Sequence, residues 1–100
     1  MSEKIRLDLS ALGEDGLYGP PDGLRALAYE LCIPARQELV AEVRAIDRTI
    51  QVYPNSRGRI GCSDGQYLGI GSTHQPGFRA VLTRLAALDY VSRIDPSYAE

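Results

Sequence analysis

Two segments of this chain repeat their apolar residues at helical spacing, and an extended pattern flanks each of them. The first segment, residues 35–47, places Leu39, Val43 and Ile46 on one face. The second segment carries its apolar residues in the same way, at Phe78, Val81, Leu82, Leu85 and Leu88. Because two helices must alternate with extended chain, this pattern constrains the fold more than any other feature.

The extended segments surround the two helices in a definite order, at residues 24–33, 49–53, 66–71 and 90–94. The order strand, helix, strand, strand, helix, strand predicts an α+β fold with a ferredoxin-like βαββαβ core over residues 24–95. That core has one antiparallel sheet with both helices on one face. Alternation over residues 4–9 predicts an extra N-terminal strand, and glycine and proline at 13–23 predict an arm that joins it to the core.

The sequence leaves three structural points open. Residues 24–33 fit a strand better, but their Ala and Leu content also fits a helix. Residues 59–63 are expected to be extended, either as a hairpin that turns at Asp64-Gly65 or as one bent strand with a bulge there. The open face of the sheet is covered by the N-terminal arm or by a second copy of the chain.

Length and charge limit the function classes. The chain has 100 residues, so we expect a single domain, with residues 1–23 as strand and arm and 96–100 as a tail. A net charge of −2 argues against broad nucleic-acid binding, which needs a clustered basic face. No apolar run is long enough to span a membrane, and the N-terminus lacks the pattern of a secretory signal. We therefore expect a cytoplasmic protein.

One edge of the predicted sheet is a candidate anion site. If the strands at 24–33 and 66–71 run parallel at the sheet centre, both helices begin at the same edge. Helix N-termini carry unpaired N–H groups that attract anions. The residues that this arrangement brings together for ligand binding are Arg36, Ser72, Thr73 and Gln75.

A cysteine and the only histidine would lie at that same edge. Cys32 at a helix start would have a lowered pKa, and His74 could serve as its base, which makes the two residues catalytic candidates. The alternative is that Cys32 and Cys62 are small buried hydrophobic residues of a reducing compartment. We expect neither a metal site nor a cofactor, because no spacing of the titratable residues matches a known metal site.

The turn at residues 57–61 has two arginines. Arg57-Gly58-Arg59-Ile60-Gly61 resembles the basic-Gly-aromatic-Gly strand of RNA-recognition domains, but Arg59 and Ile60 stand where the stacking aromatic residues belong. A solvated turn is therefore favoured over RNA binding, and Arg57 and Arg59 are candidates for contact with a carboxylate of a protein partner or with a phosphate.

These features favour a small binding or regulatory module that recognises a protein partner or a small anionic ligand and self-associates, most simply as a homodimer. The alternative is a small Cys-dependent enzyme or redox-active protein that uses Cys32 with His74. An enzyme is the less favoured of the two.

Overall fold

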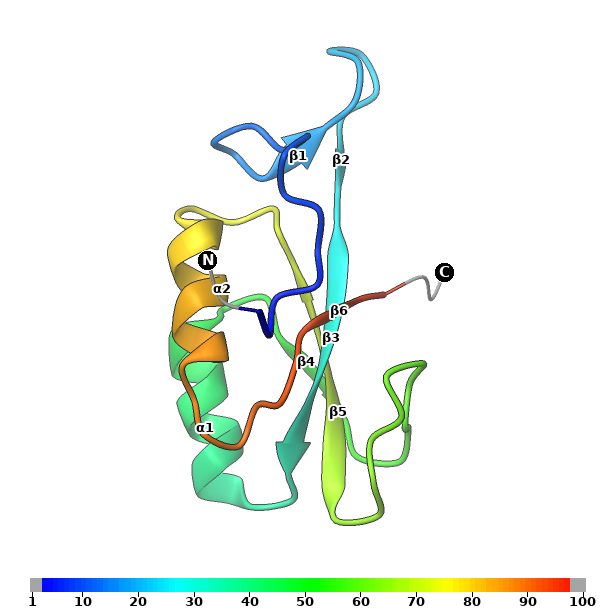
Figure 1. Ribbon diagram of the computed structural model, residues 1–100, viewed down its shortest axis with the longest axis vertical. Helices are drawn as coiled ribbons and strands as arrows, with labels where there is room; N and C mark the ends of the chain where they lie inside the picture. The colour runs from blue at the N-terminus through cyan, green and yellow to red at the C-terminus, as the bar shows by residue number, and fades with distance from the viewer. Residues whose placement is uncertain (1–2, 98–100) are drawn as a thin grey trace.

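The computed structural model describes residues 3–97, which form two helices and two antiparallel sheets (Figure 1). The elements in chain order are β1 (Leu17–Tyr18), β2 (Arg25–Ala26), β3 (Ala28–Pro34), α1 (Gln37–Ile46), β4 (Gln51–Tyr53), β5 (Gln66–Ser72), α2 (Phe78–Ala86) and β6 (Asp95–Pro96). The predicted α+β class is thus confirmed. The prediction of one sheet is wrong, because β1 and β2 form a separate two-stranded sheet in the arm.

The larger sheet has the strand order β4-β5-β3-β6, and every neighbouring pair in it is antiparallel. The central strands β3 and β5 pair from Ala28–Ser72 to Pro34–Gln66. The parallel pairing that we predicted for these two strands is wrong. Helix α1 connects β3 to β4, and these two strands have the same direction. β5 lies between them and is antiparallel to both.

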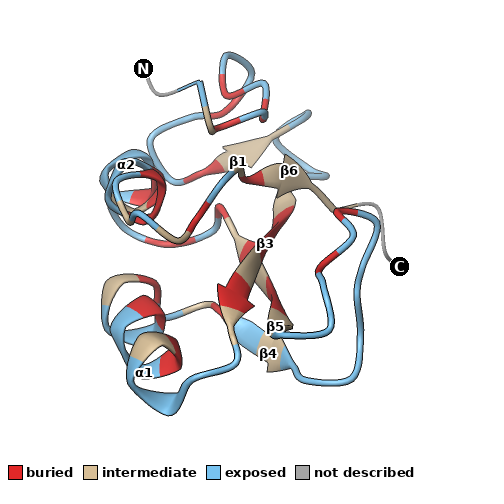
Figure 2. Cartoon of the chain, turned by 60° about the horizontal axis from the view of Figure 1, so that its bottom comes forward, coloured by how far each residue is buried: buried red, intermediate tan, exposed pale blue. Residues whose placement is uncertain are grey.

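Residues 24–33 are extended, which decides the first open point in favour of a strand. Alternate residues Tyr29, Leu31 and Ile33 are all 0% exposed and belong to the main core. Both helices lie on this side of the sheet, with their buried residues turned toward it (Figure 2). Pairing with β5 and β6 and burial against two helices therefore outweigh the helix propensity of this segment.

The N-terminal segment completes the same core without forming the predicted strand. Ile5, Leu7 and Leu9 are buried, as their alternation predicts. Within residues 3–97, the only β-bridge of this segment is the isolated parallel one between Ile5 and Ile94. Lys4 also donates to the Leu88 carbonyl, and Arg79 donates to the Leu9 carbonyl. The segment therefore contributes apolar side chains rather than a ladder of backbone hydrogen bonds.

The opposite face of the larger sheet carries the connection between β4 and β5, residues 54–65. Residues 58–61 form a turn and residues 62–63 belong to no strand, so neither the hairpin nor the bent strand predicted for this region is present. Ile60 and Cys62 pack on Leu68 of β5 in a second, smaller apolar cluster. The open face is thus partly covered by this loop, which we call the β4–β5 loop.

The final strand is shorter and later than predicted. Of residues 90–94, only Ile94 forms a bridge, and β6 follows at Asp95–Pro96. The predicted tail, residues 96–100, lies mostly outside the described residues, the last of which is Ser97. Within residues 3–97, no helix has the length and apolar character needed to cross a membrane.

Candidate functional site

The predicted catalytic pair is not assembled. Cys32 forms a disulfide with Cys62, with their Cα atoms 5.5 Å apart, so Cys32 has no thiolate available as a nucleophile. The expectation that the two cysteines are merely buried and reduced is corrected by the same bond. His74 lies beyond the Ser72 end of β5, whereas Cys32 pairs with Leu68 further along the sheet.

The residues of the predicted anion site do not lie together either. Because β3 and β5 are antiparallel, α1 begins at one end of the sheet and α2 at the other. Arg36 lies at the first end, where it is exposed and forms an ion pair with Glu38 at 2.8 Å. Ser72, Thr73 and Gln75 lie at the other end, so Arg36 cannot act with them on one ligand.

Thr73 and Gln75 have partners inside the protein. Thr73 is 0% exposed, and its Oγ1 donates to the Gly16 carbonyl at 2.7 Å and accepts from the Leu27 amide at 2.9 Å. It therefore fastens the arm to the end of β5. Ser72 accepts a hydrogen bond from the His74 amide at 3.1 Å, which is a local turn contact.

Gln75 belongs to a buried polar network under the helices. Its Nε2 donates to Asp47 Oδ1 at 3.0 Å and to the Tyr29 hydroxyl at 3.1 Å. The Tyr29 hydroxyl donates to Asp47 Oδ2. Burial, followed by the negative charge of Asp47, raises the pKa of Tyr29 well above its ordinary value. Because these groups are buried and bonded to one another, the network is suited to stabilising the core rather than to binding a ligand.

Of the two predicted contact arginines, Arg57 is exposed and forms an ion pair with Asp64. Arg59 lines a cavity on the sheet face opposite the helices. The structure therefore places these two residues in different surroundings, although they are neighbours in the turn.

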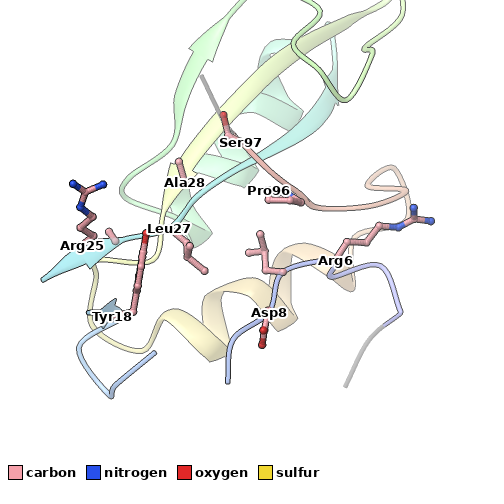
Figure 3. Close-up of a pocket in the computed structure, with 10 residues that line it drawn as sticks. Arg6, Asp8, Tyr18, Arg25, Leu27, Ala28, Pro96 and Ser97 are labelled. Carbon is pink, nitrogen blue, oxygen red and sulfur yellow. The ribbon is translucent and has the colours of Figure 1, made fainter. Parts of the chain in front are cut away.

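Another cavity lies elsewhere, between the arm and the N-terminal segment (Figure 3). We call it the arm cleft. Its volume is about 530 Å³, within the range of ligand-binding cavities. One wall is the extended chain at residues 25–28, and the other walls are residues 6–8, Tyr18 and residues 96–97.

The strand that lines the arm cleft has an unpaired edge. Leu27 bonds Thr73 through both its N–H and its C=O, so these groups point toward β5. Leu17, opposite Ala26, directs its own N–H and C=O to Asp15 and Gly13 and not to β2. Since successive residues of a strand face opposite edges, these contacts indicate that the Ala26 N–H and C=O face the edge of β2 that lies away from β1 and borders the arm cleft. Within residues 3–97, β1 is the only strand that pairs with β2, so this second edge has no partner strand.

Charged residues lie at the ends of the arm cleft. Figure 3 shows Arg25 at one end and Arg6 at the other, and both residues are exposed. Asp8 lies near Arg6, where the Ser10 hydroxyl at 2.6 Å and the Ser10 amide at 3.1 Å both donate to its carboxylate. These hydrogen bonds hold the pKa of Asp8 below its ordinary value. The cleft thus has two cations against one anion whose charge is already partly satisfied.

Sequence reasoning missed the arm cleft. Arg6 and Arg25 are separated by the whole arm, and nothing in their spacing indicates that they line one cavity. The sequence signal for the cleft is Pro96: a proline cannot donate a ladder hydrogen bond, so it favours an early end to the last strand and leaves part of the neighbouring edge uncovered.

Comparison with known proteins gives no further guide to the site. No family model, no curated protein and no solved structure matches this chain.

Proposed function

We propose that the protein is a peptide-binding module that adds an extended acidic segment of a partner protein to the edge of β2 in the arm cleft. The observation that carries this proposal is the edge of β2 away from β1, which borders the arm cleft and with which no strand of residues 3–97 pairs. Extended peptides bind such edges through backbone hydrogen bonds, and side-chain pockets supply the specificity. Arg6 and Arg25 favour a peptide with carboxylate side chains.

The geometry of the cleft supports a short extended segment over a compact ligand. The wall of residues 25–28 continues the line of β3, and β6 covers only Tyr29 and Glu30 of that strand. A bound segment would pair with the part of this edge that β6 leaves uncovered. Leu27 and Pro96 offer apolar contacts between the two arginines (Figure 3).

We also propose that the larger sheet and its helices form a ferredoxin-like unit to which the arm is added. The order β4-β5-β3-β6, with the chain order strand, helix, strand, strand, helix, strand, supports this assignment. The Cys32–Cys62 disulfide supports an oxidising compartment over the expected cytoplasm, because cytosolic thiols are kept reduced.

The proposed function is tested with an eight-residue peptide of alternating Val and Glu, labelled with fluorescein. We expect it to bind at low salt, and we expect Arg25→Ala or Arg6→Ala to weaken binding roughly fivefold, which corresponds to about 1 kcal/mol for an exposed ion pair. Arg44→Ala, on the exposed face of α1, is the matched control and should leave binding unchanged.

A second readout tests the backbone contact. Binding should slow hydrogen exchange of the Ala26 amide, because a peptide strand would accept a hydrogen bond from it. A Val and Lys peptide that binds equally well would contradict the proposal, and so would unchanged exchange at Ala26. If free glutamate slows hydrogen exchange at the Ala26 amide as much as the peptide does at the same concentration, the ligand is a small anion. A dimer that dissociates on Arg25→Ala would identify a second copy of the chain.

A further inference from the structure

A second cavity lies on the sheet face opposite the helices, beside the β4–β5 loop. We call it the face cavity. Its volume is about 500 Å³, and Leu68 and Ile70 of β5 form its floor. The Tyr53 ring lines one wall and is 43% exposed. An apolar floor of this size suits the body of a small organic molecule.

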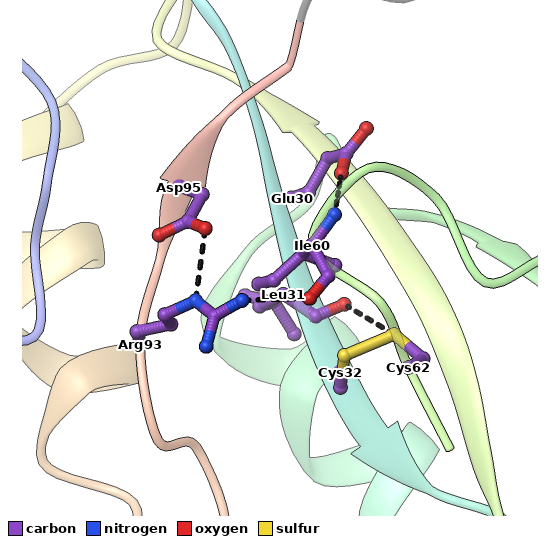
Figure 4. Close-up of polar contacts among 7 residues, drawn as sticks. All are labelled: Glu30, Leu31, Cys32, Ile60, Cys62, Arg93 and Asp95. Atoms are coloured by element: carbon purple, nitrogen blue, oxygen red, sulfur yellow. Dashed lines mark hydrogen bonds and ion pairs between the residues drawn. A yellow bond between two sulfur atoms is a disulfide. The ribbon is translucent and has the colours of Figure 1, made fainter.

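A buried carboxylate lies at one end of the face cavity. Glu30 is 1% exposed, and one of its oxygens accepts a hydrogen bond from the Ile60 amide at 3.1 Å (Figure 4). The other oxygen accepts from the Ser97 hydroxyl at 2.9 Å. A carboxylate can accept about four hydrogen bonds, so two of these sites are used by uncharged donors. Burial of the charge favours a further donor, and a cationic donor most of all.

Two contacts hold the wall above Glu30 in place. The Cys32–Cys62 disulfide joins the β4–β5 loop to β3, and Arg93 donates to the Ile60 carbonyl at 2.7 Å (Figure 4). Gly58 has a φ of +62°, and a Cβ there would lie 2.8 Å from Leu68 Cδ1 and 2.9 Å from Glu30 Oε1, so glycine at this position favours the close approach of the loop. The cavity is therefore formed before any ligand binds, which reduces the entropy lost on binding.

The charges around the face cavity favour a cation at its inner end. Arg59 also lines the cavity, but it is exposed, so solvent screens its charge. Glu30 is excluded from solvent, so its charge acts at close range on anything bound beside it.

We propose that the face cavity binds a small primary amine with an apolar body, whose ammonium group donates to Glu30 while the body packs on Leu68 and Ile70. This site is separate from the arm cleft and does not depend on the function proposed for it. The probes are 2-phenylethylamine and its uncharged counterpart 2-phenylethanol, and binding is followed by NMR at the Ile60 amide, which bonds Glu30.

The amine should bind at least about tenfold more tightly than the alcohol in the native protein. Glu30→Gln should remove this preference while keeping the fold, because a glutamine oxygen can still accept from the Ile60 amide. Glu14→Gln changes an exposed carboxylate and is the matched control. Arg25→Ala should leave amine binding unchanged, which separates this site from the arm cleft.

A second variant keeps the test decisive if Glu30→Gln fails to fold. Ile70→Trp should fill the cavity and abolish binding of amine and alcohol alike. The proposal is overturned if the native protein binds both probes equally, if neither binds at about 10 mM, or if Ile70→Trp leaves binding intact.

Discussion

At the scale of single residues, the Tyr29 hydroxyl is a buried polar group with two buried partners. It donates to Asp47 and accepts from Gln75, and all three residues are at most 5% exposed. Gly71 lies against the Tyr29 ring, where a Cβ would come within 2.6 Å of a ring carbon. The ring is therefore held in one position, so loss of the hydroxyl would leave Asp47 Oδ2 without the Tyr29 donor, whereas Gln75 Nε2 would keep its bonds to Asp47 Oδ1 and the Ser72 carbonyl.

We predict that Tyr29→Phe lowers the free energy of unfolding by about 1.5–3 kcal/mol at pH 7, the usual value for a buried hydrogen bond to a charged group. Urea denaturation measures this loss. Tyr90→Phe is the matched control, because the Tyr90 hydroxyl donates to the exposed Glu42 at 2.6 Å and should matter less. Equal losses in the two variants would contradict the role assigned to the network.

The same network predicts a pH dependence. The folded protein raises the pKa of Tyr29, so the stabilisation is present below the ordinary tyrosine pKa of about 10 and is lost as the pH rises above it. Urea denaturation at pH 7 and at about pH 11 should show a smaller loss of stability in Tyr29→Phe than in the native protein.

At the scale of elements, the arm is fixed to the core at one point of very close approach. Gly16 has a φ of +78°, and a Cβ there would lie 1.7 Å from the Thr73 carbonyl oxygen. The Thr73 hydroxyl bonds the Gly16 carbonyl at the same place. The position of β2, and with it the arm cleft, therefore depends on a glycine at this contact.

Gly16→Ala should lower the free energy of unfolding by at least about 3 kcal/mol and speed hydrogen exchange in β1 and β2. Gly77→Ala is the matched control: its φ is +65°, but no atom lies within 4 Å of the added Cβ. It should cost only about 1–2 kcal/mol, the usual penalty for a left-handed residue. Similar costs in the two variants would rule out the close contact as the cause.

At the scale of the whole molecule, the two sheet faces are closed by different means. The helix face is covered by α1, α2 and the N-terminal segment in one large apolar core. Among residues 3–97, the opposite face has a small cluster around Ile60 and Leu68, and the disulfide joins this cluster to β3. A cluster of that size contributes little hydrophobic stabilisation, so the covalent bond is expected to hold the loop in place.

The disulfide therefore makes a measurable contribution to global stability. Reduction should lower the free energy of unfolding by about 2–4 kcal/mol, the typical effect of one native disulfide. Urea denaturation with and without a reductant measures the loss. The double variant Cys32→Ser, Cys62→Ser should match the reduced protein and should not respond to reductant. An unfolding midpoint that reductant does not change would show that the bond is dispensable.

Much of the fold could be predicted from the sequence because it depends on local periodicity. The helical repeat around Val43 and Leu82 and the extended chain from Tyr29 to Ile33 are recognisable from nearby residues alone. The alternation of Ile5, Leu7 and Leu9 likewise identified a buried face, although the segment is not a strand.

The tertiary structure alone decided strand direction, and with it the site. Once β5 lies between β3 and β4, it must be antiparallel to both, and the two helix starts move to opposite ends of the sheet. That arrangement separates Arg36 from Thr73 and brings Arg6 close to the arm. Bonds between distant residues, such as Cys32 to Cys62, leave no periodic trace in the sequence, because they depend on which segments the whole fold brings together.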